Sequence, residues 1–248
     1  MKIGTVPYIN GLPLTYGLTE PLVKRTPAEL VNDLLCDEID IAMVPVYAIL
    51  KHNLYMHPSA GVIACDGPVK SVGFFTRSFI QELAQIRSVY LDRESLTSVF
   101  LAKILLKKYF DVSLYDVEFF HHDNRELADA QLLIGDKALF YDGRPAQFWD
   151  FGQLWKELTG LGFMFACWAS KRPLSSDEMT TLVKAKELGL VSRDKIASEF
   201  PIEQQTLVRD YLTNNIIYEP SPDIKEGLKL YRSLLREYQY IESERKVA

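Results

Sequence analysis

A short stretch near the amino terminus decides the fold, and it reads Ile3-Gly4-Thr5-Val6-Pro7-Tyr8-Ile9-Asn10-Gly11-Leu12-Pro13-Leu14. Its apolar beginning predicts a buried strand, and Pro7 ends that strand because proline has no backbone N–H to donate. Pro13 suits the first turn of a helix, where the backbone N–H groups have no partner inside the helix. The stretch therefore predicts a strand, a polar turn and a helix.

The polar turn is a candidate ligand site. In open α/β sheets, small molecules bind where the carboxyl end of a strand meets the start of a helix. Tyr8 and Asn10 lie at that position. Asn10 fits equally well as an ordinary helix cap, because asparagine is one of the preferred capping residues. The residues of the turn leave both interpretations open.

The composition is that of an ordinary globular protein. The chain has 248 residues, of which 48% are hydrophobic and 25% are charged, so it can bury a sizeable core. It has no apolar run of the roughly 18 residues that a membrane span needs. The first strand soon meets Pro7, so the opening residues also lack the continuous apolar segment of a signal peptide. We therefore expect a cytoplasmic protein with no membrane partner.

The formal charge of −5 favours a small ligand over nucleic acid. The sequence shows no basic stripe that could neutralise phosphates, so we expect no nucleic-acid partner. An anionic small molecule would have to be held by local donors such as helix N-termini. The three cysteines, Cys36, Cys65 and Cys167, are widely spaced among apolar residues. They predict free, buried thiols without a disulfide or a metal site, and the sequence leaves the oligomeric state open.

A second strand repeats the pattern of the first. Thr26-Pro27-Ala28-Glu29 predicts a helix start with a capping box, in which the two outer side chains each bond the backbone N–H of the other residue. The helix is followed by the apolar run 39–44, which stops at Pro45. If the helix makes a right-handed crossover, both strands are parallel and end at the same edge of one sheet. We therefore expect Pro45 beside the first polar turn.

The rest of the chain predicts an α/β protein with several polar strand ends. Ser71 enters a strand over 72–75, Gly135-Asp136 follows a strand over 131–134, and Ser95-Leu96-Thr97-Ser98 opens an amphipathic helix. Hydroxyls and free N–H groups at a helix start can bind a carboxylate, although they more often only cap the helix. Further strands are expected over 62–65, 88–91, 117–120 and 163–168, and further helices over 150–158, 175–188 and 223–240.

No established catalytic motif accompanies these strand ends. The spacing of the four histidines, His52, His57, His121 and His122, matches no metal site. The chain also lacks a Walker loop, a G-x-S-x-G elbow and a G-x-G-x-x-G stretch. Four aspartates are candidate acids or bases, although acids near strand ends are more often turn formers: Asp40, Asp92, Asp136 and Asp150.

Four stretches together resemble the chorismate dehydratase family of the futalosine route to menaquinone. They are Val6-Pro7-Tyr8-Ile9-Asn10 with Pro13-Leu14; Asp40-Ile41-Ala42-Met43-Val44-Pro45; Ser95-Leu96-Thr97-Ser98; and Ile134-Gly135-Asp136-Lys137-Ala138-Leu139 with Asp150-Phe151-Gly152, Trp155, Thr159-Gly160-Leu161, Phe163-Met164-Phe165-Ala166 and Trp168. The resemblance thins in the helical end of the chain. It implies an α/β, two-lobed, type II periplasmic-binding-protein-like fold, with residues 1–76 and 169–248 in lobe I and residues 77–168 in lobe II.

The resemblance also implies a site between the lobes. Its catalytic residues would be Asn10 and Ser71, which orient the reacting substrate by hydrogen bonds. The substrate would be bound by Tyr8, Val44, Pro45, Thr97, Ser98, Gly135 and Asp136. The implied reaction is the dehydration of the small anionic substrate chorismate to 3-[(1-carboxyvinyl)oxy]benzoate, without a metal or an organic cofactor. The side chain of the substrate itself would act as the base.

Two positions depart from the family pattern. Relatives usually have arginine where Leu96 stands, so a positive charge near the helix start is missing, and Arg77 or Arg93 would have to replace it. Relatives also tend to have proline at the position of Gly162.

Two other functions remain compatible with such a fold. The sister enzyme 1,4-dihydroxy-6-naphthoate synthase carries a catalytic histidine in an Ile-His-Glu-Gly stretch, whereas this chain has Ile134-Gly135-Asp136-Lys137 there. That difference ranks the sister enzyme below the dehydratase. A non-catalytic solute-binding or sensor protein in the cytoplasm is the alternative from another class, because a fold alone does not give a function.

Overall fold

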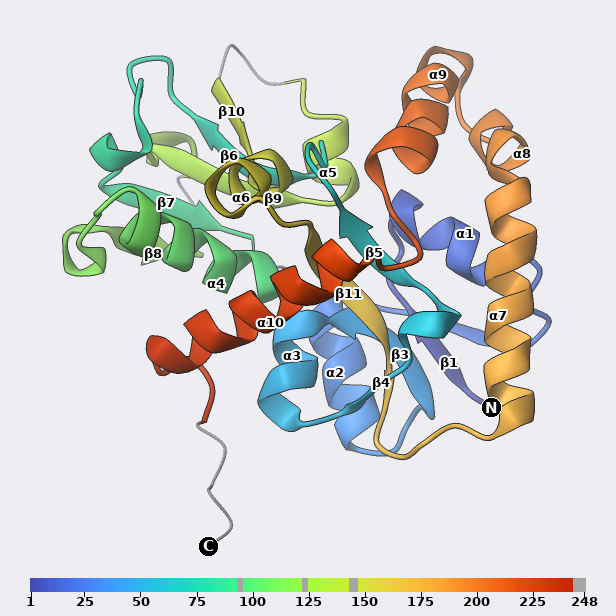
Figure 1. The fold of residues 1–248 in the computed structure, drawn as a ribbon. Helices are drawn as coiled ribbons and strands as arrows, with labels where there is room; N and C mark the ends of the chain where they lie inside the picture. The colour runs from blue at the N-terminus through green and yellow to red at the C-terminus, as the bar shows by residue number, and fades with distance from the viewer. Residues whose placement is uncertain (93–95, 122–124, 143–146, 243–248) are drawn as a thin grey trace, which may run out of the picture.

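Two sheets form the framework of the computed structural model (Figure 1), which describes residues 1–92, 96–121, 125–142 and 147–242. The first sheet has the strand order β2-β1-β3-β11-β4, and β5 also pairs with β11. The second sheet has the order β10-β6-β9-β7-β8. Each sheet contains both parallel and antiparallel pairs.

The strands of the first sheet are β1 (Ile3–Thr5), β2 (Leu22–Lys24), β3 (Ile41–Pro45), β4 (Tyr55–Met56), β5 (Val62–Cys65) and β11 (Phe163–Ser170). Those of the second are β6 (Val72–Thr76), β7 (Ser88–Leu91), β8 (Glu118–Phe120), β9 (Ala130–Ile134) and β10 (Gln147–Asp150). The α-helices are α1 (Leu12–Thr15), α2 (Pro27–Leu35), α3 (Val46–His52), α4 (Leu96–Ile104), α5 (Asp136–Leu139), α6 (Phe151–Thr159), α7 (Ser176–Val191), α8 (Arg193–Ser198), α9 (Ile202–Asp210) and α10 (Pro222–Glu237). Short 3-10 turns are η1 (Ile9–Gly11), η2 (Pro58–Ala60), η3 (Leu83–Gln85), η5 (Leu114–Asp116) and η6 (Arg125–Leu127), and π-helical turns are η4 (Leu105–Tyr109) and η7 (Tyr211–Asn215).

The predicted parallel arrangement of the strands before Pro7 and Pro45 is confirmed. β1 pairs in parallel with β3, with Ile3 opposite Ile41. The intervening α2 begins with the predicted capping box between Thr26 and Glu29. In the second sheet, β7 and β9 are parallel in the same way. Each sheet therefore presents two neighbouring carboxyl ends at one edge, which is where open α/β sheets place their ligands.

The chain changes sheet at two points that differ from the expected lobe boundaries. β6 pairs with β9 and β10 in the second sheet, whereas β11 pairs with β3 in the first. Boundaries after residues 76 and 168 would put β6 and most of β11 in the wrong sheets. The strand pairing corrects them to 66–71 and 151–162, because the connecting segments come before these two strands and not after them.

One hydrophobic core runs through both sheets. Where the chain crosses back, Trp155 of α6, Phe163 of β11 and Tyr231 of α10 are fully buried. Their rings meet edge to face, with centroids 5.1 Å apart for Trp155 and Phe163 and 5.1 Å apart for Phe163 and Tyr231. Buried aromatic pairs of this geometry contribute about 1 kcal/mol each beyond their area. They hold the crossing segment against α10, which crosses in front of β11 in Figure 1.

The same contact accounts for Gly162. A Cβ atom at this position would lie 2.5 Å from Cγ1 of Ile224 on α10 and 2.8 Å from the carbonyl oxygen of Cys65. The opposite glycine on α10 is equally restricted, because a Cβ at Gly227 would lie 1.9 Å from the Gly162 carbonyl oxygen. The glycine pair therefore lets α10 approach the crossing segment closely.

The cysteines follow the prediction in part. All three are free, and Cys65 and Cys167 are buried. Burial raises the pKa of the Cys167 thiol to about 12, so this thiol stays protonated at neutral pH. Cys36 is exposed, and its predicted place in the core is wrong because it forms the C-cap of α2, where the chain turns outward. Throughout the described chain, every helix is too short or too polar to span a membrane.

Candidate functional site

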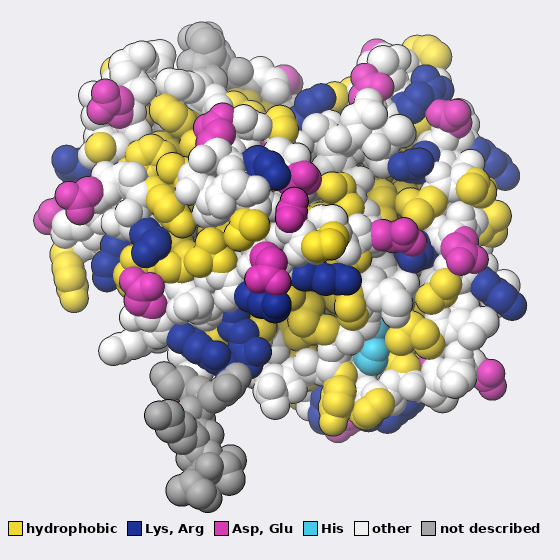
Figure 2. All heavy atoms as spheres, viewed as in Figure 1, with side chains coloured by type: hydrophobic (Ala, Val, Ile, Leu, Met, Phe, Trp, Pro, Cys, Tyr) yellow, Lys and Arg dark blue, Asp and Glu magenta, His cyan; other side chains and the backbone are white. Residues whose placement is uncertain are grey.

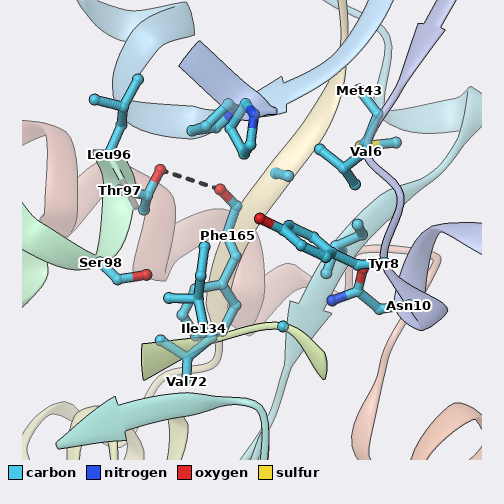
Figure 3. A pocket seen from close by; sticks show the side chains of 15 residues that line it. Val6, Tyr8, Asn10, Met43, Val72, Leu96, Thr97, Ser98, Ile134 and Phe165 are labelled. Atoms are coloured by element: carbon cyan, nitrogen blue, oxygen red, sulfur yellow. Dashed lines mark hydrogen bonds between the residues drawn. The ribbon is translucent and has the colours of Figure 1, made fainter. Parts of the chain in front are cut away.

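A cavity lies between the two sheets at the carboxyl ends of the parallel strands (Figure 3). The space inside it that a water-sized molecule can occupy is small, about 70 Å³, and the whole space between its walls, open solvent at the mouth included, is about 510 Å³. Its lining comes from both sheets and is formed by Val6, Tyr8, Asn10, Pro27, Met43, Pro45, Ile63, Val72, Leu96, Thr97, Ser98, Ile134, Gly135, Phe165 and Ala166. Of the residues predicted to surround one cavity, Tyr8, Asn10, Pro45, Thr97, Ser98 and Gly135 line this one, whereas Ser71 and Asp136 do not.

Asn10 is the most distinctive polar residue of this lining. It lies in η1, is 7% exposed and makes no capping hydrogen bond, so the alternative reading of Asn10 as a helix cap is wrong. Its Nδ2 donates to the hydroxyl of Tyr211 over 3.1 Å. Its Oδ1 is buried without a hydrogen-bond partner among the described residues. A buried amide oxygen left unpaired costs about 1–3 kcal/mol, which a ligand with a hydroxyl or N–H group would recover.

Tyr211 links Asn10 to Ser71. The Tyr211 hydroxyl donates to Ser71 Oγ over 2.7 Å while it accepts from Asn10. Tyr211 and Ser71 are almost completely buried. Burial raises the pKa of Tyr211 well above its ordinary value, so its hydroxyl keeps the proton that it donates. Sequence reasoning missed Tyr211, because η7 carries no local signal that connects it to the amino-terminal turn.

Tyr8 and Gly135 meet across the two sheets. Gly135 has φ +58° and ψ −142°, a conformation that essentially only glycine adopts. A Cβ atom there would lie 2.9 Å from Cδ1 of Tyr8, so the ring of Tyr8 rests directly on the glycine. The next residue, Asp136, accepts a hydrogen bond from the backbone N–H of Ile9 over 3.0 Å. Burial raises the pKa of Asp136, and the Ile9 bond opposes that shift only in part.

The start of α4 brings two hydroxyls to the opposite wall (Figure 3). Thr97 Oγ1 donates to the Phe165 carbonyl and accepts from the backbone N–H of Tyr47, each over 3.2 Å. Both hydrogen-bonding roles of Thr97 are thus occupied within the protein. Ser98 is buried and its hydroxyl makes no hydrogen bond within the part of the chain that the structure describes. Among the described residues of this wall, Ser98 therefore offers a hydroxyl that a ligand can bond.

Three predicted site residues lie outside the lining. Val44 is buried in β3 between Met43 and Pro45. Because side chains alternate along a strand, it points away from the cavity when its two neighbours face it. Ser71 stands behind Asn10, one hydrogen bond beyond Tyr211. Asp136 is turned toward Ile9 and fixes the Tyr8 turn.

The described part of the cavity wall carries no formal charge. Lysine, arginine, histidine and carboxylate side chains are all absent from the described lining. Arg77 donates to the Glu126 carbonyl beyond the far end of β6, so it does not replace the charge missing at Leu96. Arg93 and Ser95 fall outside the described residues. The donors that the described lining offers to an anionic ligand are therefore neutral hydroxyls and backbone N–H groups.

The candidate acids are engaged elsewhere. Asp150 caps α6 and also accepts from the backbone of Val69 and Lys70. Asp40 accepts from the backbone of Lys2. Asp92 forms an ion pair of 3.0 Å with Lys137.

Across the described chain, no group of three metal-binding side chains is found. On the face drawn in Figure 2, acidic and basic side chains are interspersed.

Two α/β sheets with a cavity between them at their strand ends place the protein in the class of periplasmic-binding-protein-like α/β folds. Protein AF1704 of Archaeoglobus fulgidus superposes with a TM-score of 0.74 at 15% identity, over 97% of this chain and 98% of that one. The periplasmic aliphatic sulphonate binding protein SsuA of Escherichia coli gives 0.67 at 14% identity, over 100% and 95%. At such identities the likeness shows the fold alone, and it confirms the predicted fold class.

The sequence relationship is more specific than the fold. Residues 1–237 match the sequence model of a family described as menaquinone biosynthesis, and the chain belongs to this family. A curated relative, the chorismate dehydratase of Thermus thermophilus, is 30% identical over 264 residues, which cover 92% of this chain and 95% of the relative. The family resemblance predicted from the four stretches is thereby confirmed.

Proposed function

We propose that the protein is a lyase that dehydrates chorismate to 3-[(1-carboxyvinyl)oxy]benzoate in menaquinone biosynthesis. Membership of the family and the name of the Thermus thermophilus relative support this assignment. The structural observation that carries it is Asn10 Oδ1, a buried acceptor without a partner among the described residues, on a residue that lines the cavity. The ring hydroxyl of chorismate is a donor that would pair with this oxygen.

The reaction asks for positioning more than for strong acids or bases. A proton leaves the ring carbon that carries the enolpyruvyl ether, and the hydroxyl leaves the adjacent carbon. The electron pair of the C–H bond becomes the third double bond of the ring, and the C–O pair departs with oxygen, which is released as water. Aromatisation supplies the driving force. Accurate placement of a proton acceptor beside the leaving hydroxyl can therefore be most of the catalysis.

The residues divide into positioning and holding roles. Asn10 Oδ1 accepts from the ring hydroxyl, and Ser71 acts through Tyr211 to hold Asn10 in place. Ser98 and the backbone N–H groups at the start of α4 hold a substrate carboxylate, because a helix N-terminus favours negative charge. Thr97 fixes α4 to β11 and α3 through its two internal hydrogen bonds.

The walls complete the site. Tyr8, Pro45 and Gly135 shape the space around the ring, together with the apolar lining residues. The described lining offers neither a carboxylate nor an imidazole. The enolpyruvyl carboxylate of the substrate therefore takes the proton from the ring and passes it to the departing hydroxyl. We include the futalosine route in this proposal because of the sequence resemblance. We also propose that the protein works in the reducing cytoplasm, because two free thiols lie in its core.

A comparison of substrates tests the proposal. The purified protein is incubated separately with chorismate and with cyclic dehypoxanthinyl futalosine, and the products are followed by mass spectrometry. Loss of one water from chorismate supports the dehydratase. Turnover of the futalosine compound alone would select the naphthoate synthase instead. Binding of chorismate without turnover would select a sensor, a role suggested by structural neighbours such as the sulphonate binding protein.

A further inference from the structure

The orientation of the Asn10 amide must be fixed if its oxygen is to meet a substrate. An asparagine amide can turn by half a rotation and exchange Oδ1 for Nδ2 at almost the same place. The two orientations present opposite chemistry to the cavity, because Oδ1 accepts a hydrogen bond and Nδ2 donates one. Asn10 makes a single side-chain hydrogen bond within the described chain, from Nδ2 to Tyr211. Whatever fixes the amide therefore acts through Tyr211.

The polarity of the Tyr211 hydroxyl decides which amide atom it bonds. A phenol has one proton to donate, and Tyr211 gives that proton to Ser71 Oγ over 2.7 Å. The hydroxyl oxygen of Tyr211 can then only accept a hydrogen bond from Asn10, and the amide atom that donates it is Nδ2. Oδ1 is thereby turned away from Tyr211 and has no hydrogen-bond partner among the described residues, on a residue that lines the cavity.

Tyr211 is itself firmly placed. It is 1% exposed, and it begins η7, which is anchored a second time where Asn215 Nδ2 donates to the Pro68 carbonyl over 2.9 Å. Both anchors of η7 reach residues 68–71, the segment in which the chain passes from the first sheet to the second. The hydroxyl is thus held by a rigid part of the fold far from the amino-terminal turn in sequence.

We propose that Tyr211 is a positioning residue, which holds the Asn10 amide with its oxygen toward the cavity and so selects a substrate that presents a hydroxyl donor at this point. The inference rests on the proposed function for the identity of that hydroxyl, the leaving group of the dehydration. Tyr211 does not touch the substrate. It acts by keeping one orientation of the amide in place before the substrate enters.

The test combines Tyr211→Phe with Asn10→Ala in a double-mutant cycle. Tyr211→Phe keeps the ring and removes the hydroxyl, and we expect kcat for chorismate to fall about tenfold, the effect of losing one buried hydrogen bond. In the Asn10→Ala background the same change is expected to alter kcat less than twofold, because its target is gone. Tyr218→Phe is the matched control, since Tyr218 is also buried and its hydroxyl has no described partner; this variant keeps wild-type kcat.

A spectroscopic measurement tests the inference without turnover. With asparagine labelled by ¹⁵N, the side-chain amide of Asn10 is identified as the signal that Asn10→Ala removes. Its protons are expected to exchange slowly in the wild type and in Tyr218→Phe, and to shift and exchange faster in Tyr211→Phe. The positioning role would be overturned if Tyr211→Phe left the Asn10 signal unchanged. It would also be overturned if kcat of the double variant fell by the product of the two single-variant losses. Inactivity of the wild type toward chorismate would instead count against the proposed function, while the amide measurement would still decide the orientation.

Discussion

The contact between Gly135 and Tyr8 gives a prediction whose size can be worked out. In Gly135→Ala the new Cβ would lie 2.9 Å from Cδ1 of Tyr8, whereas ordinary contacts begin at 3.4 Å. The ring must therefore move by about 0.5 Å. A misplacement of about 1 Å in a positioned group costs roughly 100-fold in rate, so this shift predicts a fall in kcat/KM of about tenfold. The strained backbone adds a loss of about 1–3 kcal/mol in the free energy of unfolding.

Gly160→Ala is the matched control for this prediction. Gly160 also has a positive φ, +73°, but a Cβ there meets nothing within 4 Å. It should lose about 1–2 kcal/mol of stability from backbone strain and keep its kcat/KM. The assay is the initial rate of chorismate consumption, beside urea unfolding of both variants. The reasoning would be refuted if Gly135→Ala kept wild-type kcat/KM, or if both variants lost activity equally.

Four further outcomes follow from the site and its surroundings. A chorismate analogue without the ring hydroxyl should bind the wild type about tenfold more weakly than chorismate and bind Asn10→Ala with no such difference, as measured by calorimetry; equal binding to the wild type would contradict the assigned acceptor. Ser98→Ala should raise KM for chorismate several-fold with little change in kcat, and a reversed split in steady-state kinetics would remove Ser98 from carboxylate binding. Burial raises the pKa of Asp136, so the folded state holds the carboxyl proton more tightly than the unfolded state does. Asp136→Asn should therefore gain stability relative to the wild type as the pH rises from about 4 to about 7, as measured by urea titrations. A stability difference that does not vary with pH would contradict this. Cys36 should be the thiol that a disulfide reagent titrates in the native protein, with the two buried thiols reacting only after denaturation; rapid labelling of all three would disagree with the core described above.

Much of the fold could be predicted because its signals are local. The capping boxes that begin α2 and α7 are complete within four residues, and both are observed. The apolar runs of β1 and β3 and the prolines that follow them placed two parallel strands with their ends side by side. These are short-range patterns of spacing and chemistry, which a sequence displays directly.

Other elements lacked such signals. β2 has three residues and β4 has two, too few for any period to show. α3 begins immediately after Pro45 without a capping side chain. The sequence therefore showed the end of β3 at this proline but no signal for the start of a helix. β10 ends at Asp150, the residue that then caps α6, and only the helix could be foreseen. Tertiary pairing, and not local preference, determines these segments.

The candidate site divides in the same way. Tyr8, Asn10 and Gly135 stand at strand ends, which made them candidates for a site, and the family resemblance implied their roles. Tyr211 is 201 residues from Asn10 and 140 from Ser71, so only the folded chain brings the three together. The side of β3 on which the Val44 side chain lies could not be predicted either. A shift of one residue along a strand moves every side chain to the opposite face.

The measurement that tests the central claim most directly is a single incubation of excess wild-type protein, and of Asn10→Ala, with chorismate. Asn10→Ala should melt within a few degrees of the wild type, because the change trims one side chain on a cavity wall. We predict that the wild type converts the chorismate to an aromatic product lighter by one water, and that Asn10→Ala leaves it almost entirely unchanged over the same time. Chorismate recovered intact from the wild type, or equal conversion by both proteins, would contradict the account.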